Sequence, residues 1–163
     1  MNVNHDIFKA YDIRGLYPGE IDETVARLIG RGFAAYLEAR TIAVSRDMRV
    51  SSPAIAAAFI NGAREQGADV IDYGMLGTDQ MYFAVVDDGL DGGAQITASH
   101  NPGRYNGIKM VRAGALPLSG CAPARTILMP LYSPGLCDAV ICAPPSRLSS
   151  TTAKYIWSVP SMP

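Results

Sequence analysis

The chain has 163 residues, of which 48% are hydrophobic and 18% charged, with a formal net charge of -1. This length suits one ordinary domain, and the composition excludes a disordered chain. The near-neutral charge gives no reason to expect nucleic acid or a membrane as a partner, and no apolar run approaches the roughly 20 residues of a membrane span. Because the N-terminus lacks a basic region followed by an apolar one, we expect a cytoplasmic protein.

Three segments have the pattern of amphipathic, capped helices. Apolar residues at three- and four-residue spacing, preceded or followed by stop signals, predict helices over 21–40, 53–66 and 78–88. Asp22, Ser52 and Thr78 are suited to cap their N-termini. Pro53 fits the first helical position of the second helix, and Gly67 is a natural residue to follow its end.

Short apolar or β-branched runs alternate with these helices and predict strands over 41–45, 68–73, 93–98 and 108–112. Such alternation is typical of an α/β domain, here of three α/β/α layers around a mostly parallel, mixed sheet. Sheets of this kind place ligands in the loops beyond the carboxyl ends of their strands. Two loops are therefore candidates for a site: RDMR over 46–49 and SHNPGRYNG over 99–107.

The composition changes near Gly120. Fourteen of the 15 acidic residues precede it, whereas seven of the 11 prolines follow it. Proline removes a backbone donor and interrupts helices and strands. We therefore divide the chain into a domain over 1–120 and a divergent tail over 121–163, expected to be irregular and poorly ordered. The tail is either a natural extension or the product of a frameshift or recombined end.

The second loop contains residues suited to phosphate chemistry. Ser99 follows a predicted strand on a tight turn, and an exposed serine hydroxyl can act as a nucleophile or phosphate carrier. His100 could polarise a hydroxyl or transfer a proton, and Lys109, ten residues after Ser99, could supply positive charge. Taken alone, however, Ser-His-Asn-Pro is more often an ordinary turn than a catalytic loop.

Longer strings favour the catalytic interpretation. TASHNPGRYNGIK over 97–109 resembles the phosphoserine loop of the α-D-phosphohexomutases, the phosphomannomutase/phosphoglucomutase family, and is most similar to its bacterial branch. FKAYDIRG over 8–15 is similar to that family's N-terminal FxxYDIRG segment, and SRDMRVSSP over 45–53 to its GRDxRxSSP loop. The resemblance covers about residues 6–120, the N-terminal domain of the family only.

The resemblance implies a phosphosugar mutase, an isomerase that interconverts hexose 1-phosphate and hexose 6-phosphate through a phosphoserine and a bisphosphorylated sugar. It implies that Ser99 carries the phosphate, that glucose 1,6-bisphosphate is an activator, and that Mg²⁺ bridges the phosphoserine and three aspartates of a DGDGDR loop in a second domain. No DGDGDR occurs in this sequence. The metal site is therefore incomplete, and we expect a truncated first domain that needs the missing C-terminal domains and is inactive alone.

The resemblance also assigns roles to five other residues. Arg14 would contact the phosphate, and Lys109 would stabilise the transferring group or accept a proton. His100 would act near the sugar, Tyr11 would line the cleft, and Asn101 would shape the loop.

Other interpretations stay open from the residues alone. The chain could be a non-catalytic phosphosugar-binding fragment or a pseudoenzyme remnant, or a phosphate binder in which Ser99 is inert. A hexose phosphate is the expected partner of the enzyme. We expect Arg46 and Asp47 to pair with each other and hold their loop.

Overall fold

A computed structural model of the chain describes residues 3–9 and 12–118. Within these residues three α-helices alternate with strands: α1 (Glu23–Leu37), α2 (Ser52–Glu65) and α3 (Thr78–Asp87). The strands are β1 (Asp12–Leu16), β2 (Thr41–Arg46), β3 (Asp69–Met75), β4 (Gly92–Ile96), β5 (Tyr105–Arg112) and β6 (Leu116–Pro117). Two short 3-10 turns are η1 (His5–Ile7) and η2 (Ala113–Ala115). The predicted tail over 121–163 lies outside the described residues.

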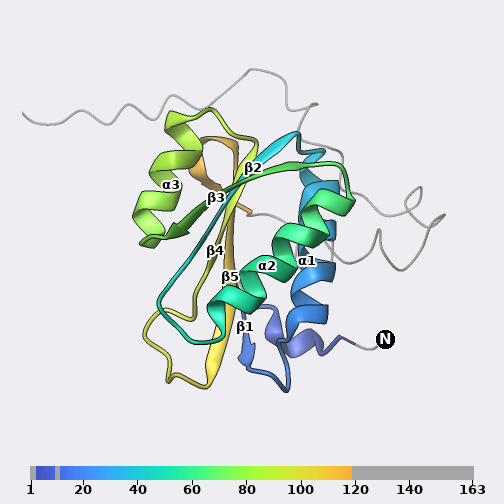
Figure 1. Cartoon of the computed structure of the whole chain (residues 1–163), viewed down its shortest axis with the longest axis vertical. Coiled ribbons are helices and arrows are strands. Elements are labelled where there is room, and N and C mark those ends of the chain that lie inside the picture. Colours follow the sequence, from blue (N-terminus) through green and yellow to red (C-terminus); the bar gives the residue numbers. More distant parts are fainter. Residues whose placement is uncertain (1–2, 10–11, 119–163) are drawn as a thin grey trace, which may run out of the picture.

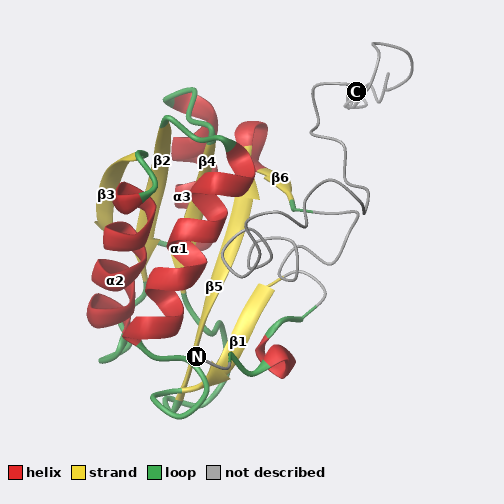
Figure 2. Ribbon diagram, turned by 90° about the vertical axis from the view of Figure 1, so that its right-hand side faces the viewer, coloured by secondary structure: helices red, strands yellow, loops and turns green. Residues whose placement is uncertain are grey.

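These strands form one mixed sheet in the order β1-β5-β4-β2-β3, with β6 paired to β5. Figure 2 shows this order from β3 at one margin to β1 near the other. β2 is parallel to both β3 and β4, whereas β5 is antiparallel to β4, β1 and β6. Every described strand except β5 therefore points the same way, which confirms the mostly parallel, mixed sheet.

Helices cover both faces of the sheet, as predicted for three α/β/α layers. α1 and α2 lie side by side on one face, and α3 lies on the other (Figure 1). The larger core fills the α1–α2 side and is built around fully buried side chains such as Ile29, Phe33, Ile42, Phe59 and Ile108. A smaller core of five buried residues lies on the α3 side: Ala43, Met81, Val85, Leu90 and Val111. No helix within the described residues is long and apolar enough to cross a membrane.

α1 and α2 pack closely because glycines face the contact. A Cβ atom on Gly30 would lie 2.1 Å from the carbonyl oxygen of Phe59, and one on Gly62 would lie 2.0 Å from that of Arg27. Any side chain at either position would push the helices apart. Next to this contact the rings of Phe33 and Phe59 pack at 5.9 Å between centroids, in the range of favourable aromatic pairs.

The structure also differs locally from the sequence prediction. β1 was not predicted, because only Ile13 and Gly15 of its five residues are buried and the alternation is too short to stand out. β5 begins at Tyr105 rather than 108, since its ladder with β1 draws two turn-type residues into the strand. Asp22 caps α1 as predicted, accepting from Val25 N at 2.8 Å, whereas Ser51 rather than Ser52 precedes α2.

Candidate functional site

The two loops singled out in the sequence meet at the carboxyl ends of β2 and β4. We call 47–51, between β2 and α2, the Arg49 loop, and 97–104, between β4 and β5, the Ser99 loop. Because β2 and β4 are adjacent and parallel, the two loops leave the sheet side by side, at the lower end of Figure 1. Asp47 N donates to Ile96 O at 3.0 Å between them. The predicted placement of both loops at one edge of the sheet is confirmed.

Ser99 is exposed in its loop and has an unusual backbone conformation. Its φ is +56°, in the left-handed region, which disfavours a residue with a Cβ by about 1–2 kcal/mol. Its N–H donates to Thr97 Oγ1 at 3.0 Å. The hydroxyl oxygen lies 3.2 Å from His100 Nδ1, within hydrogen-bond distance. The loop therefore presents the serine hydroxyl to solvent with an imidazole beside it.

Asn101 closes the turn around these two residues. Its backbone N and its side-chain Nδ2 both donate to the carbonyl oxygen of Ala98, at 3.1 and 2.8 Å. The Asn101 side chain is therefore committed to the loop's own backbone.

Arg14 and Lys109 gather around a carboxylate on neighbouring strands. Asp12 and Lys109 are directly opposite in the β1–β5 ladder, and Arg14 lies two residues along β1 on the same face. Asp12 Oδ2 is 2.5 Å from Arg14 Nη2 and 3.8 Å from Lys109 Nζ. Arg14 Nε is buried without a hydrogen-bond partner among the described residues. The cluster holds two cations against one anion, so it retains positive charge.

The structure places the predicted residues in two clusters at one end of the sheet. Among the described residues no hydrogen bond or ion pair joins Ser99 to Arg14 or Lys109. The clusters are linked through Gly107, which lies opposite Arg14 in the ladder and accepts the N–H of Thr97 at 3.0 Å. Tyr11 lies outside the described residues.

The expected pairing of Arg46 with Asp47 is wrong. Asp47 instead pairs with Arg49, with Oδ2 3.1 Å from Arg49 Nε, and its Oδ1 accepts from Arg49 N and from Ser52 Oγ at 3.0 and 2.6 Å. The physical reason is that the two residues belong to different elements. Arg46 is the last residue of β2 and is paired in the sheet, whereas Asp47 begins the loop that leads to α2, so its side chain binds residues of that loop and of the helix start.

Buried Asn106, in β5 just after the Ser99 loop, ties that strand to the Arg49 loop and to the start of α2. Its Nδ2 lies 2.7 Å from Ser51 Oγ and 3.1 Å from Ser52 Oγ. Its Oδ1 accepts from Gly107 N at 2.8 Å, so the amide is fully used at the base of the Ser99 loop. Sequence reasoning missed Asp12, Arg49 and Asn106, although each lies inside one of the three quoted motifs.

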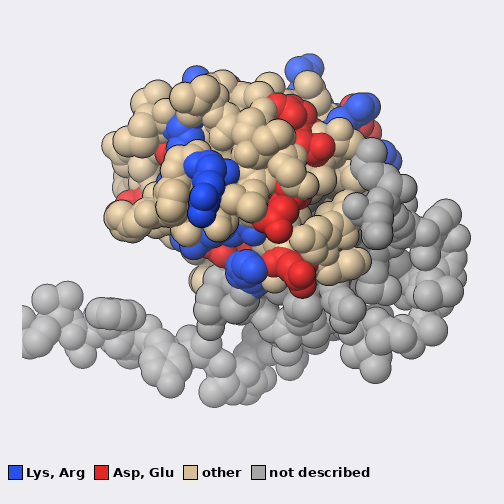
Figure 3. Space-filling model, turned by 90° about the horizontal axis from the view of Figure 1, so that it is seen from below, with Lys and Arg blue, Asp and Glu red and all other residues tan. Residues whose placement is uncertain are grey.

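The electrostatics at this end are mixed. Seen from below, the visible part of the surface carries both Lys or Arg and Asp or Glu side chains (Figure 3). On α3, burial raises the pKa of the Tyr82 hydroxyl, and the negative charges of Asp79 and Asp12 raise it further.

The described residues do not supply a magnesium site by themselves. No group of three His, Cys, Asp or Glu side chains gathers within the described ranges. Nearby carboxylates are already engaged, Asp12 by Arg14 and Asp47 by Arg49. Mg²⁺ prefers an octahedral set of oxygen ligands, which these residues do not offer.

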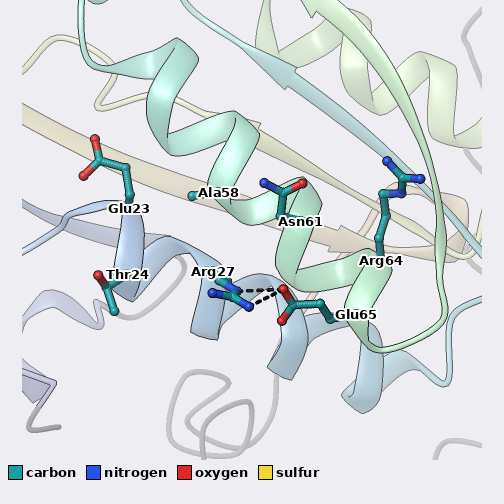
Figure 4. A pocket seen from close by; sticks show the side chains of 7 residues that line it. All are labelled: Glu23, Thr24, Arg27, Ala58, Asn61, Arg64 and Glu65. Atoms are coloured by element: carbon teal, nitrogen blue, oxygen red, sulfur yellow. Dashed lines mark hydrogen bonds and ion pairs between the residues drawn. The ribbon is translucent and has the colours of Figure 1, made fainter.

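A separate hollow lies on the outer surface of α1 and α2, away from both loops. It has a volume of about 710 Å³ and is lined by Glu23, Thr24, Arg27, Ala58, Asn61, Arg64 and Glu65. Figure 4 shows Arg27 and Glu65 pointing toward each other across it, and Arg27 Nη2 lies 2.5 Å from Glu65 Oε1. Its lining has no serine, and two glutamates balance its two arginines, so it does not resemble the Ser99 loop with its neighbouring positive cluster.

Comparison with known proteins places this geometry in a family. Residues 5–126 match the phosphoglucomutase/phosphomannomutase alpha/beta/alpha domain I. A phosphomannomutase of Salmonella montevideo is 47% identical over 124 residues, covering 76% of this chain and 27% of that protein. A phosphomannomutase of Escherichia coli strain K12 is 46% identical over 120 residues, covering 74% of this chain and 26% of that protein.

A solved structure shows the same fold. A phosphoglucomutase/phosphomannomutase family protein from Burkholderia thailandensis matches with a TM-score of 0.69 and 37% identity, over 78% of this chain and 31% of that one. The chain thus spans about a quarter to a third of the length of these relatives. The family match and the shared fold agree with the three motifs, and the chain therefore belongs to the phosphoglucomutase/phosphomannomutase family.

Proposed function

We propose that Ser99 carries a phosphoryl group and that this chain provides the phosphoserine domain of a phosphohexomutase. The observation that carries the proposal is the exposed Ser99 hydroxyl, with His100 Nδ1 3.2 Å from it, on a loop fixed by hydrogen bonds. A phosphoryl carrier needs an accessible oxygen in a constant position, because positioning supplies much of the rate in such transfers.

The reaction is a pair of phosphoryl transfers. A hydroxyl oxygen of the hexose phosphate attacks the phosphorus on Ser99, the bond from phosphorus to Ser99 Oγ breaks, and a bisphosphorylated sugar forms. The proton lost by the sugar hydroxyl is taken up by His100, and Ser99 regains a proton as its hydroxyl is released. After the sugar reorients, Ser99 Oγ gives up its proton and attacks the other phosphorus. The bond from that phosphorus to the sugar oxygen breaks, the sugar oxygen takes up a proton, and the isomeric monophosphate leaves.

The positive cluster on β1 and β5 supports this role. Within the described residues the Arg14 guanidinium donates a hydrogen bond to Asp12 alone, so it keeps donors for phosphate oxygens. Lys109, 30% exposed, keeps its ammonium group near the same carboxylate at 3.8 Å. We assign Arg14 and Lys109 to charge stabilisation of the transferring group, Asn101 to loop closure, and Tyr11 to the cleft wall.

Two parts of the proposed enzyme lie outside this sequence. Mg²⁺ is the proposed cofactor, but the described residues do not form its site. The domains that complete the site in the family are not matched by this chain, which covers 27% of the Salmonella relative. We therefore expect negligible mutase turnover from the 163-residue chain alone, and hexose phosphate binding and phosphorylation of Ser99 as its share of the reaction.

Mass spectrometry of the purified chain and its peptides tests the proposal. After incubation with glucose 1,6-bisphosphate and Mg²⁺, we expect one phosphoryl group on the peptide that contains Ser99. Ser99→Ala should take up none, and Ser45→Ala, which changes a buried serine, should take up as much as the wild type. A Ser99 that stays unmodified would overturn the carrier role and favour a non-catalytic phosphosugar-binding remnant.

A further inference from the structure

Arg49 uses every N–H group of its guanidinium inside the protein. A guanidinium has five such donors. Four of them, on Nη1 and Nη2, donate to backbone carbonyl oxygens at 2.7–3.1 Å, and the acceptors belong to Ser99, Asn101, Pro102 and Tyr105. The fifth, on Nε, donates to Asp47 Oδ2 at 3.1 Å. One side chain thus holds most of the Ser99 loop by its backbone.

Arg49 is itself held in place. Its side chain is 12% exposed, and Asp47 fixes it through both the guanidinium and the backbone N–H. Asp47 in turn accepts from Ser52 Oγ and donates its own N–H to Ile96 O, at the end of β4. The guanidinium is therefore anchored to the sheet and to the first residue of α2.

This arrangement separates Arg49 from the phosphate-binding role assigned to Arg14. With all five donors used, Arg49 could contact a substrate phosphate only by releasing a loop carbonyl. Arg14 has one hydrogen bond, to Asp12, and an unpartnered Nε among the described residues. Arg14 and Arg49 therefore have different tasks, although both carry the fork of donors that suits phosphate.

The Ser99 loop needs such a support. Ser99 has a left-handed φ of +56°, and the bond from Arg49 Nη2 to its carbonyl at 2.9 Å fixes the peptide plane that follows it. That plane sets the direction of His100 relative to the Ser99 hydroxyl. Pro102 has no N–H to donate within the loop. Its carbonyl oxygen accepts from Tyr105 N as well as from Arg49 Nη1, both at 2.9 Å, so Arg49 adds to the local hydrogen bonds of the loop.

Resting on the proposed function, we propose that Arg49 is a positioning residue for phosphoryl transfer, which fixes the Ser99 loop through three of its carbonyl oxygens and that of Tyr105 at the start of β5, and does not touch the substrate.

Substitution of Arg49 tests this role by the rate at which Ser99 takes up phosphate from glucose 1,6-bisphosphate. Arg49→Lys keeps the charge but offers three donors from one nitrogen, which cannot span four carbonyls. We expect Arg49→Lys and Arg49→Ala to slow the transfer by roughly 100-fold, the effect of a small misplacement of reacting groups. The donor concentration that gives half the maximal rate should change little. Arg64→Ala, at an exposed position on α2, should match the wild type.

Hydrogen exchange provides a readout that does not depend on chemistry. In Arg49→Lys the amides of the Ser99 loop should exchange faster, while those of α1 and α2 keep their wild-type protection. This pattern separates a loosened loop from global unfolding.

Three outcomes would overturn the inference. In the first, Arg49→Lys transfers phosphate at the wild-type rate. In the second, the maximal rate is kept while the half-saturating donor concentration rises, which would make Arg49 a substrate ligand. In the third, exchange in the Ser99 loop is unchanged. A wild-type chain that accepts no phosphate overturns the proposed function instead, and loop exchange then still decides whether Arg49 holds the loop.

Discussion

The α1–α2 face of the sheet and the two loops at its carboxyl end are held together by different forces. Between the helices and the sheet, apolar side chains such as Phe33 and Phe59 are fully buried, and glycines let the helix backbones touch. At the loop end, Arg49 and Asn106 make hydrogen bonds that cross 50 or more residues of sequence. Apolar burial supplies most of the folding free energy, whereas directional bonds fix where a backbone atom lies.

The difference indicates how stability and function can be separated in this domain. Loss of a core contact should lower the free energy of unfolding and leave the geometry of the loops in the folded molecules intact. Loss of a donor or acceptor in the loop network should cost less stability but displace Ser99. Each variant below tests one side of that division.

The largest expected effect is in the core. Phe59→Ala leaves a cavity beside Phe33 at the α1–α2 contact and should reduce the free energy of unfolding by about 3–5 kcal/mol. Phe83→Ala makes the same change on α3 where the ring is 67% exposed, and should stay within about 0.5 kcal/mol of the wild type. Urea denaturation measures both. Similar losses for the two variants would mean that the α1–α2 face is not the principal core.

An intermediate effect is expected in the loop network. Asp47→Asn removes the charge that accepts from Arg49 Nε, and should cost about 2 kcal/mol, as expected for a hydrogen bond to a charged group. It should also speed amide exchange in the Ser99 loop. Asp69→Asn, on exposed β3, is the control and should do neither. If Asp47→Asn loosened α1 and α2 as much as the loop, the two regions would not be separable.

The helices and layers could be predicted from the sequence, whereas features that depend on long-range contacts could not. Asp22, the three helices and the α/β/α layers depend on local spacing and apolar periodicity, and these were predicted. β1 was not, because its strand conformation depends on a ladder to β5, whose paired residues are 89 to 97 positions away in the sequence. Element bounds such as Ser51 before α2 shift by a residue because cap geometry depends on contacts.

In the candidate site, too, the sequence predicted contacts between neighbouring residues but not contacts between distant ones. Ser99, His100 and Asn101 are adjacent in sequence, so their mutual contacts lie within the reach of a short motif. Arg49 stood in a quoted motif, but its four carbonyl partners are 50 to 56 residues away, and no periodicity reports such contacts. The expected Arg46–Asp47 ion pair is absent for a related reason, since the side chains of adjacent charged residues need not point toward each other.

The smallest effect is expected for an arginine–carboxylate ion pair that lies outside the loop network. Arg27 and Glu65 form an ion pair on the outer surface of α1 and α2, with side chains 57% and 36% exposed, against 12% and 15% for Arg49 and Asp47. Exposed pairs gain little because water screens the charges and two long side chains must be ordered. Glu65→Gln should therefore shift the urea midpoint by a small fraction of the Asp47→Asn shift. At about 0.5 M NaCl its shift should vanish, since salt screens exposed charges, while that of Asp47→Asn persists. Equal losses of stability from the two variants, or equal sensitivity of those losses to salt, would contradict this expectation. Burial would then not distinguish the Asp47–Arg49 pair of the loop network from the exposed Arg27–Glu65 pair.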